Sequence, residues 1–593
     1  MISYFFSNKS DVLNESCYNN SIDSTYVLNP IPSDLILGKD VMNDLEVFQP
    51  YDNQTQEATL IHKLNQAQTI GGKQFIIDLI KNPIFNKNVL EKRIECMKTI
   101  NQNNKLTIDK QHENDFMWLH STNDETITEL LNSIYFQNFF TRKLNQSETV
   151  LTSYNIYRII ISPVLGVISP IIYFLIPYFI LKIKFGNKLQ LPFTTYIKLI
   201  IKSINSSRDF MKLFGNNGTL NRLQTLTYVF SLIFYFQGIL NSSDIAITSY
   251  KIIHYISDKI NNAMLFLQSC LSFVQKNTNI LKQYAHIYVD NFTPINEVML
   301  DTVKNYNPYK SFSIFSHFGK QLKLYKNLVK QDTLPIVNQC YLLDALYSLN
   351  QCKENLHLSY PTFISYNDND SIRFVSKESW NIHLPFDEAI KNDIDLGNTI
   401  ITGPNAGGKS TTIKMIATNV LLAQTIGLTS SSETIMTPFF FINTQINIPD
   451  CKGQESLFEA EMNRCLYNLN TITENNDKPA LIIMDEIFNS TNVVEAISGA
   501  YAILEKMATY TNTISIITTH LTYLTKLKKT SSFDCYCMSV TMNEDGEFTY
   551  PYYLKQGVSK QYIALELLKN RGFPIDVIEN ALKIKEHFVV KRV

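Results

Sequence analysis

Residues 399–413 constrain the fold of this chain most strongly, and they read TIITGPNAGGKSTTI. The β-branched run 399–402 predicts a short buried strand, and helical spacing resumes after it from Thr411. Between them lies Gly-x-x-x-x-Gly-Lys-Ser, which indicates a phosphate-binding P-loop when it joins a strand to a helix. Its glycines let backbone N–H groups face an anion, and the helix N-terminus adds the positive end of its dipole. The residues predicted to hold the phosphates are Gly403, Pro404, Asn405, Ala406, Gly407, Gly408, Lys409, Ser410 and Thr411.

Two later strand ends carry the chemistry that hydrolysis of a nucleoside triphosphate needs. The apolar run 481–484 ends in Asp485 and Glu486. Asp485 can share Mg²⁺ with Ser410, and Glu486 can polarise the attacking water. Residues 513–519 predict another buried strand, and His520 follows at its carboxyl end, where it can contact the γ-phosphate. The sequence therefore predicts an ATPase with the cofactors ATP and Mg²⁺, converting ATP and water to ADP and phosphate.

Charge and cysteine usage exclude several other classes of protein. The net charge is −1 over 593 residues, so any contact with nucleic acid must come from a local basic patch. The nine cysteines are scattered, and the closest pair, Cys535 and Cys537, has the wrong spacing for a zinc knuckle. Reduced thiols indicate an intracellular location, in the cytoplasm or a DNA-containing compartment such as the nucleus. We expect no signal peptide, because the first residues lack a basic segment followed by a long apolar run.

Helical patterns dominate the chain before the P-loop. Apolar residues at helical spacing predict helices at 60–67, 75–80 and 89–100, with Pro83 closing the second. Strand-like pieces appear at 363–366 and 372–375. The predicted organisation is a polar tail (1–34), a helical region from Leu35 (35–158), a hydrophobic insertion (159–243), a helical return and connector (244–380) and an α/β P-loop domain (381–593).

The insertion contains two uncharged stretches, 159–181 and 223–243, each long enough to span a bilayer. Prolines recur every seven residues in the first, which a membrane helix tolerates better than a soluble one. The segment between the two stretches, 182–222, carries eight Lys or Arg and one acid, Asp209. A spanning hairpin would put this basic loop opposite a cytosolic ATPase, against the positive-inside rule. An embedded hairpin at an anionic membrane surface and a soluble hydrophobic insertion both remain open.

The motifs of the P-loop region resemble those of the MutS family, the ATPases of DNA mismatch repair. The segment 401–411 resembles that family's P-loop, 481–491 its Walker B strand and loop, and 514–524 its histidine segment. The resemblance implies that Ser456, with Arg464 on the same helix, belongs to a segment that reaches a partner's nucleotide. It also implies that 557–562 and 572–574 begin a helix-turn-helix that packs two ATPases together. Asn392 matches a nucleotide-edge motif, and Tyr552 is the candidate to stack on adenine because Ala389 replaces the usual aromatic residue.

The resemblance extends to 68–83 and 90–93, which look like the start of that family's helical core and lever. No Phe-x-Glu occurs in the first hundred residues, so we expect no mismatch-reading domain. The resemblance implies an ABC-type, MutS-like α/β ATPase domain, paired in a homodimer, behind a largely α-helical core and lever. The expected function is a dimeric DNA-binding clamp in repair or recombination. The alternative is a membrane-anchored ATPase with a structural or remodelling role.

Overall fold

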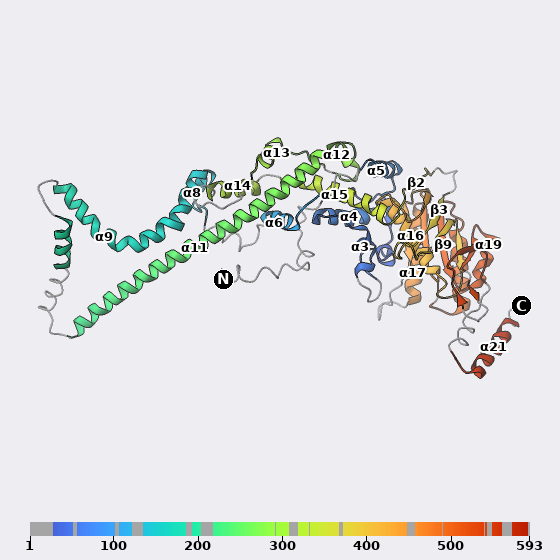
Figure 1. Cartoon of the computed structure of the whole chain (residues 1–593). Helices are drawn as coiled ribbons and strands as arrows, with labels where there is room; N and C mark the ends of the chain where they lie inside the picture. Colours follow the sequence, from blue (N-terminus) through green and yellow to red (C-terminus); the bar gives the residue numbers. More distant parts are fainter. Residues whose placement is uncertain are drawn as a thin grey trace. The chain divides into compact units, whose positions relative to one another are not determined.

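The computed structural model describes residues 28–50, 56–100, 106–120, 134–185, 192–202, 218–290, 292–307, 318–330, 333–366, 372–446, 457–488, 490–538, 540–542, 548–559 and 572–590. The chain divides into two units. The first holds Met1–Thr107, Cys270–Ile295 and Leu334–Val593, and the second holds Ile108–Ser269 and Asn296–Thr333. Figure 1 labels their helices and strands.

A seven-stranded sheet organises the first unit, with the strand order β1-β7-β8-β9-β5-β10-β13. All neighbouring pairs are parallel except β10 and β13. A second sheet has the order β2-β6-β3-β4, and β11 pairs with β12. The strands are β1 (Ile36–Leu37), β2 (Thr362–Phe363), β3 (Phe374–Ser379), β4 (Asn392–Asp395), β5 (Thr399–Thr402), β6 (Glu433–Met436), β7 (Phe441–Gln445), β8 (Ala480–Met484), β9 (Thr513–Thr519), β10 (Asp534–Met538), β11 (Thr541–Met542), β12 (Phe548–Thr549) and β13 (Leu554–Gln556).

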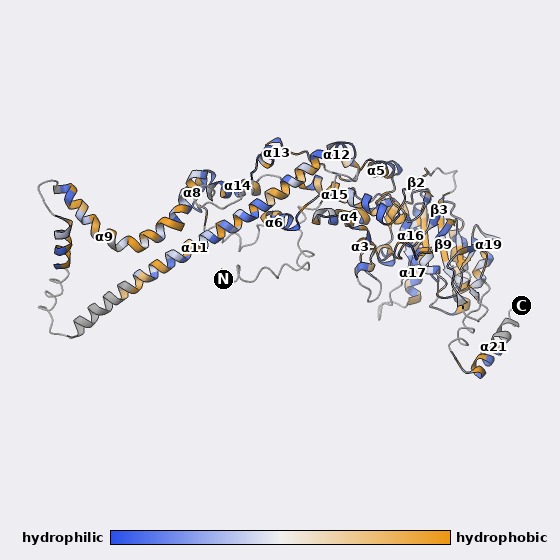
Figure 2. Ribbon diagram, in the orientation of Figure 1, coloured by the Kyte–Doolittle hydropathy of each residue, from blue (hydrophilic) through white to orange (hydrophobic). Residues whose placement is uncertain are grey.

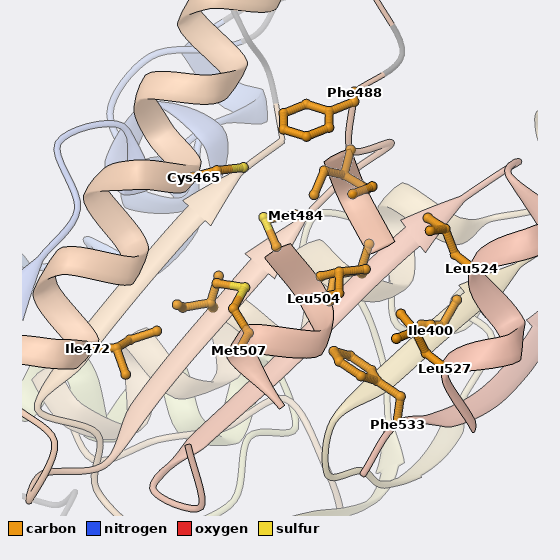
Figure 3. Close-up of a cluster of buried hydrophobic side chains, with 14 of the residues drawn as sticks. Ile400, Cys465, Ile472, Met484, Phe488, Leu504, Met507, Leu524, Leu527 and Phe533 are labelled. Carbon is orange, nitrogen blue, oxygen red and sulfur yellow. The ribbon is translucent and has the colours of Figure 1, made fainter. Parts of the chain in front are cut away.

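Apolar strands at the centre of the large sheet are covered by helices. Ile400, Ile482 and Ile517 lie on one face of the sheet in a single buried cluster. Figure 3 shows that α17, α18 and the segment after β9 contribute side chains such as Ile472, Leu504 and Leu524 to this cluster. Strands buried on both faces read as continuous apolar runs, which is why β8 is recognisable in the sequence. The strand β9 is recognisable by its β-branched residues.

The first unit's helices are mostly short. They are α2 (Val41–Asp44), η3 (Gln56–Ala58), α3 (Leu60–Leu64), α4 (Ile70–Lys81), α5 (Lys87–Thr99), α12 (Thr278–Tyr284), η7 (Ala285–Ile287), α15 (Leu334–Asn355), α16 (Lys409–Thr425), α17 (Leu457–Glu474), α18 (Val493–Met507), η8 (Thr522–Lys526), α19 (Leu527–Thr530) and α21 (Ile575–Val590). The helices predicted near 60, 75 and 89 are confirmed as α3, α4 and α5. The predicted helical pattern from Leu35 is wrong at its start, because Ile36–Leu37 form β1 at the sheet edge. Two residues are too few to display a strand period.

A buried carboxylate fastens α4 to α15. Asp344 accepts hydrogen bonds from the backbone N–H and the hydroxyl of Thr69, at 2.8 and 2.6 Å, and from the N–H of Gln68. The Thr69 hydroxyl oxygen in turn caps α4 by accepting from the N–H of Gly72. Burial raises the pKa of Asp344, and these hydrogen bonds oppose that shift. The Thr-x-Gly-Gly sequence therefore marks a helix start that is locked onto α15.

The second unit is helical. Its elements are α6 (Lys110–His120), η4 (Arg142–Gln146), α8 (Glu148–Ile156), the π-helix η5 (Tyr157–Ile161), α9 (Ser162–Phe185), α13 (Glu297–Lys304), α14 (Phe318–Lys330) and most of α11 (Gly218–Lys276). Asp115 of α6 pairs with Lys259 of α11 and accepts from Asn262 at 2.7 Å. By length and composition, one helical stretch among the described residues could cross a membrane, Glu148–Ser169.

Candidate functional site

The glycine-rich segment forms a tight loop between β5 and α16. Gly407 N–H donates to the carbonyl of Pro404 at 3.1 Å, and α16 begins at Lys409. Gly408 has φ 92°, a left-handed conformation that glycine adopts without strain. A Cβ atom there would also lie 2.9 Å from the ring of Tyr552. Two independent constraints therefore require glycine directly before Lys409.

Lys409 is the buried cation of the site. Its Nζ donates to the carbonyls of Gly403 and Pro404 at 3.1 and 3.2 Å, and its side chain is only 4% exposed. Burial lowers the pKa of Lys409, while the charges of Glu486 and Asp485 oppose that shift. Nζ lies 3.8 Å from Glu486 Oε1. The lysine thus lies folded under its own loop, beside the acid that balances its charge.

The carboxylates sit where β8 ends, and the neighbouring strand positions them. Thr518 of β9 donates its hydroxyl to Asp485 Oδ1, and its carbonyl accepts from the Glu486 N–H at 3.1 Å. Glu486 has φ 52°, an uncommon conformation for a residue with a side chain. Because β5, β8 and β9 are parallel, their carboxyl ends bring Lys409, Asp485 and His520 to one edge of the sheet.

His520 contacts both Glu486 and Lys409 through one ring nitrogen. Nε2 lies 2.6 Å from Glu486 Oε1 and 3.1 Å from Lys409 Nζ. A nitrogen that carries a proton can donate to the carboxylate but cannot accept from the lysine. The shorter distance favours donation to Glu486. The hydrogen bond with His520 lowers the pKa of Glu486; partial burial opposes this, and the positive charge of Lys409 adds to it.

A cavity of about 450 Å³ opens beside the loop. Its lining includes Asn392, Tyr552, the loop residues Pro404 to Thr412, and Glu486. The Asn392 amide donates to the Tyr552 carbonyl at 3.1 Å, and its oxygen accepts from the Leu554 N–H at 2.8 Å. Asn392 therefore fixes the backbone that presents the Tyr552 ring. The tyrosine itself has φ 55°.

The structure brings most of the predicted site residues together. The loop residues 404–411, Asn392, Tyr552 and Glu486 line one cavity, and His520 joins it through Glu486 and Lys409. Ser410 and Thr411 are exposed in the first turn of α16. Ser456 lies outside the described residues, and Arg464 pairs with Asp40 at 2.9 Å.

Sequence reasoning missed several residues of the site. Asn381, Leu384, Glu388, Ile390 and Met415 also line the cavity. Thr518 was not predicted either, although its place near the end of a parallel strand, two residues before His520, could have indicated it. The residues 381–390 carry no comparable pattern, because they reach the cavity from irregular backbone rather than from a periodic element.

Fold and site define an α/β protein of the ATPase-domain class. Residues 399–589 match MutS domain V. The chain is 29% identical over 252 residues to the DNA mismatch repair protein MutS of Alkaliphilus metalliredigens. This alignment covers 41% of the present chain and 28% of the relative. The chain is 27% identical over 281 residues to the same-named protein of Streptococcus agalactiae, covering 46% and 31%. It is 30% identical over 191 residues to the Drosophila melanogaster DNA mismatch repair protein spellchecker 1, covering 32% and 20%.

These matches show that the C-terminal part of the chain, residues 399–589, is a MutS-family domain. The aligned region spans less than a third of the length of each of these relatives. The expectation of an α/β fold for the C-terminal part is confirmed.

Proposed function

We propose that this protein hydrolyses ATP to ADP and phosphate. The observation that carries the proposal is the meeting of Lys409, Glu486 and His520 at the carboxyl edge of a parallel sheet, next to a cavity of about 450 Å³. Such an edge, with a glycine-rich loop at a helix N-terminus, is suited to hold a polyphosphate.

Each residue has a role in this proposal. The loop amides of 403–408 and Lys409 hold the phosphates, and Tyr552 stacks on the base. The Ser410 hydroxyl and the Asp485 carboxylate are hard oxygen donors that fit Mg²⁺, and the ion would neutralise phosphate charge there. Glu486 orients and polarises the attacking water, and His520 contacts the γ-phosphate.

The ion pair in the structure gives this mechanism a starting state. Lys409 must leave the carbonyls of Gly403 and Pro404 to reach a phosphate, which also removes it from Glu486. The Glu486 carboxylate then loses one cationic neighbour and becomes a better acceptor for a water proton. Nucleotide binding and activation of the base are therefore coupled through one side chain.

We propose a homodimer with composite sites. Exposed apolar side chains support this: Met462 and Leu466 on α17, and Val493 and Val494 at the start of α18. The two regions adjoin, because Phe458 contacts the Phe488 ring at 5.4 Å and Ser490 donates to Glu461 at 2.9 Å. A partner subunit could cover this surface, with Ser456 and the helix-turn-helix completing the contact.

The names of the relatives support a proposal about what this ATPase acts on. Their names refer to DNA mismatch repair. We propose that the protein is an intracellular DNA clamp that acts in repair or recombination. Residues 381–593 form its ATPase domain, and residues 35–158 and 244–380 form its helical core and lever. The alternative is a membrane-anchored ATPase with a structural or remodelling role, favoured by the exposed apolar side chains of α9 and α11.

Loss of Lys409 tests the binding step. In Lys409→Ala we expect at least a hundred-fold loss of Mg²⁺-ATP affinity, because a buried charge-assisted contact to phosphate disappears. Lys506→Ala, which removes an exposed lysine from the last turn of α18, should bind as the wild type does. Calorimetric titration of both variants measures the difference. Equal affinities would refute the assignment of the loop.

A further inference from the structure

The strongest unassigned feature is an apolar surface carried by two helices of the second unit. Val167, Ile176 and Ile180 of α9 are 53%, 49% and 55% exposed, and Ile233, Phe234 and Phe236 of α11 are 51%, 68% and 60% exposed. We call these residues the apolar hairpin surface. Figure 2 shows α9 as predominantly hydrophobic along its length. Soluble monomers rarely expose contiguous apolar patches larger than a few hundred Å².

The two helices are joined at this surface. The Tyr235 hydroxyl of α11 donates to the Val167 carbonyl of α9 at 2.7 Å. Pro170 and Pro177 stand inside α9, where each proline costs a backbone hydrogen bond in water. Membrane helices tolerate proline because neighbouring groups satisfy the freed carbonyls.

Exposure on α9 is not confined to one stripe. Consecutive pairs are exposed, Val164 with Leu165, Val167 with Ile168, and Phe179 with Ile180. Successive helix positions point about 100° apart, so these pairs cover a broad arc. A helix that docks in a protein groove shows one apolar face, whereas a helix apolar all round is typical of a lipid environment.

The length of α9 and the charged residues at its end match the dimensions and headgroups of a bilayer. The 24 residues of α9 rise about 36 Å, against a hydrocarbon thickness of about 30 Å. Lys182 and Lys184 lie exposed in its last turn, and 159–181 contains no charged residue. Exposed Lys198 and Lys202 follow in the helix 193–202, which contacts Tyr178 of α9 through Phe193 and Tyr196. Basic residues at one end of an apolar helix complement anionic headgroups.

We propose that the apolar hairpin surface inserts into a lipid bilayer and that the lysines at the end of α9 contact anionic headgroups. A DNA duplex offers phosphates but no apolar phase, so it leaves Ile176, Phe179 and Ile180 in water. The proposal is independent of ATP hydrolysis, which depends on residues of the first unit.

Flotation of the full-length protein with vesicles tests the proposal. We expect it to float with phosphatidylcholine vesicles and more strongly when a quarter of the lipid is phosphatidylserine. Ile176→Ser/Phe179→Ser/Ile180→Ser should reduce partitioning at least about a hundred-fold, because three apolar side chains lose their burial. Phe139→Ser/Phe140→Ser/Val298→Ser, which changes three exposed apolar residues outside α9 and α11, is the matched control and should float normally. Lys182→Gln/Lys184→Gln should lower binding about ten-fold or more to anionic vesicles only.

Circular dichroism and ATP affinity establish that each variant is folded. Wild-type protein that stays at the bottom of the gradient would overturn the proposal. So would a triple serine variant that floats as the wild type does. If the triple variant instead turns a dimer into a monomer, the surface is a contact between copies. If Lys182→Gln/Lys184→Gln loses only the salt-dependent binding of a DNA duplex and floats as the wild type does, the two lysines bind DNA phosphates rather than lipid headgroups.

Discussion

Tyr552 is held in an uncommon backbone conformation beside the phosphate-binding loop. Its backbone is left-handed at φ 55°, its ring lies next to Gly408, and Asn392 holds its carbonyl at 3.1 Å. A left-handed conformation is costly for a bulky residue and persists only when its surroundings hold it. The hydrogen bond from Asn392 therefore fixes the backbone of Tyr552, which lines the cavity.

We expect Tyr552→Ala to weaken ATP binding about ten-fold or more, because stacking of a base on an aromatic ring contributes about 1–3 kcal/mol. Tyr552→Phe keeps the ring and should bind as the wild type does. Inorganic tripolyphosphate has no base, so its affinity should be the same in all three proteins. A loss of tripolyphosphate binding in Tyr552→Ala would show that the tyrosine supports the loop rather than the base.

The residues of the site were predictable from the sequence where strand ends and the loop motif mark them. Lys409, Asp485, Glu486 and His520 follow apolar runs, and parallel strands bring such ends together. The hydrogen bonds from Lys409 to the carbonyls of Gly403 and Pro404 were not predictable. They depend on how close the ends of β5, β8 and β9 lie in the folded protein. Glu388 and Asn381 were missed, because nothing periodic places them on the cavity.

At the scale of elements, the packing of α4 on α15 depends on one small residue. A Cβ atom at Gly71 would overlap the ring of Tyr341, which is buried in α15. The same helix start is fixed by Thr69 and Asp344. Gly71 therefore allows close approach between the two helices, which the sequence alone does not reveal.

Gly71→Ala should destabilise the protein by about 2 kcal/mol, because overpacking of a tight contact outweighs the roughly 1 kcal/mol that alanine contributes to a helix. Gly397→Ala is the control, since nothing lies within 4 Å of a Cβ at that position. Chemical denaturation of the two variants provides the comparison. Equal midpoints for both would contradict the close packing of α4 on Tyr341.

Long periodic or apolar elements were predictable, and short edge elements were not. The helices α4 and α5 show helical spacing, β8 is a continuous apolar run, and β9 is rich in β-branched residues. β1 has two residues, and only its pairing with Phe441 and Ile442 of β7 defines it. Pairing between segments about 400 residues apart leaves no local signal.

At the scale of the whole molecule, the proposed homodimer depends on the surface around α17. Leu466 is 55% exposed and sits on the helix that carries Arg464. Leu466→Lys should prevent ATP-dependent dimerisation, because a charge would be buried in the contact. The variant should still bind ATP more tightly than Lys409→Ala, because Lys409 and the loop belong to the same chain and only the partner's contribution is lost. Sedimentation velocity with and without Mg²⁺-ATP tests this, and a variant that still dimerises would contradict the proposed surface.

Turnover of a Glu486→Ala variant shows whether Glu486 and the loop form a hydrolytic site. Removing Glu486 frees Lys409 from its ion pair at 3.8 Å, so Mg²⁺-ATP should bind at least as tightly as in the wild type. Without the carboxylate that polarises water, steady-state phosphate release should fall at least a hundred-fold. Measurement of both quantities on one preparation separates binding from chemistry. Tight binding with lost turnover is the predicted result, and turnover equal to that of the wild type would contradict the account.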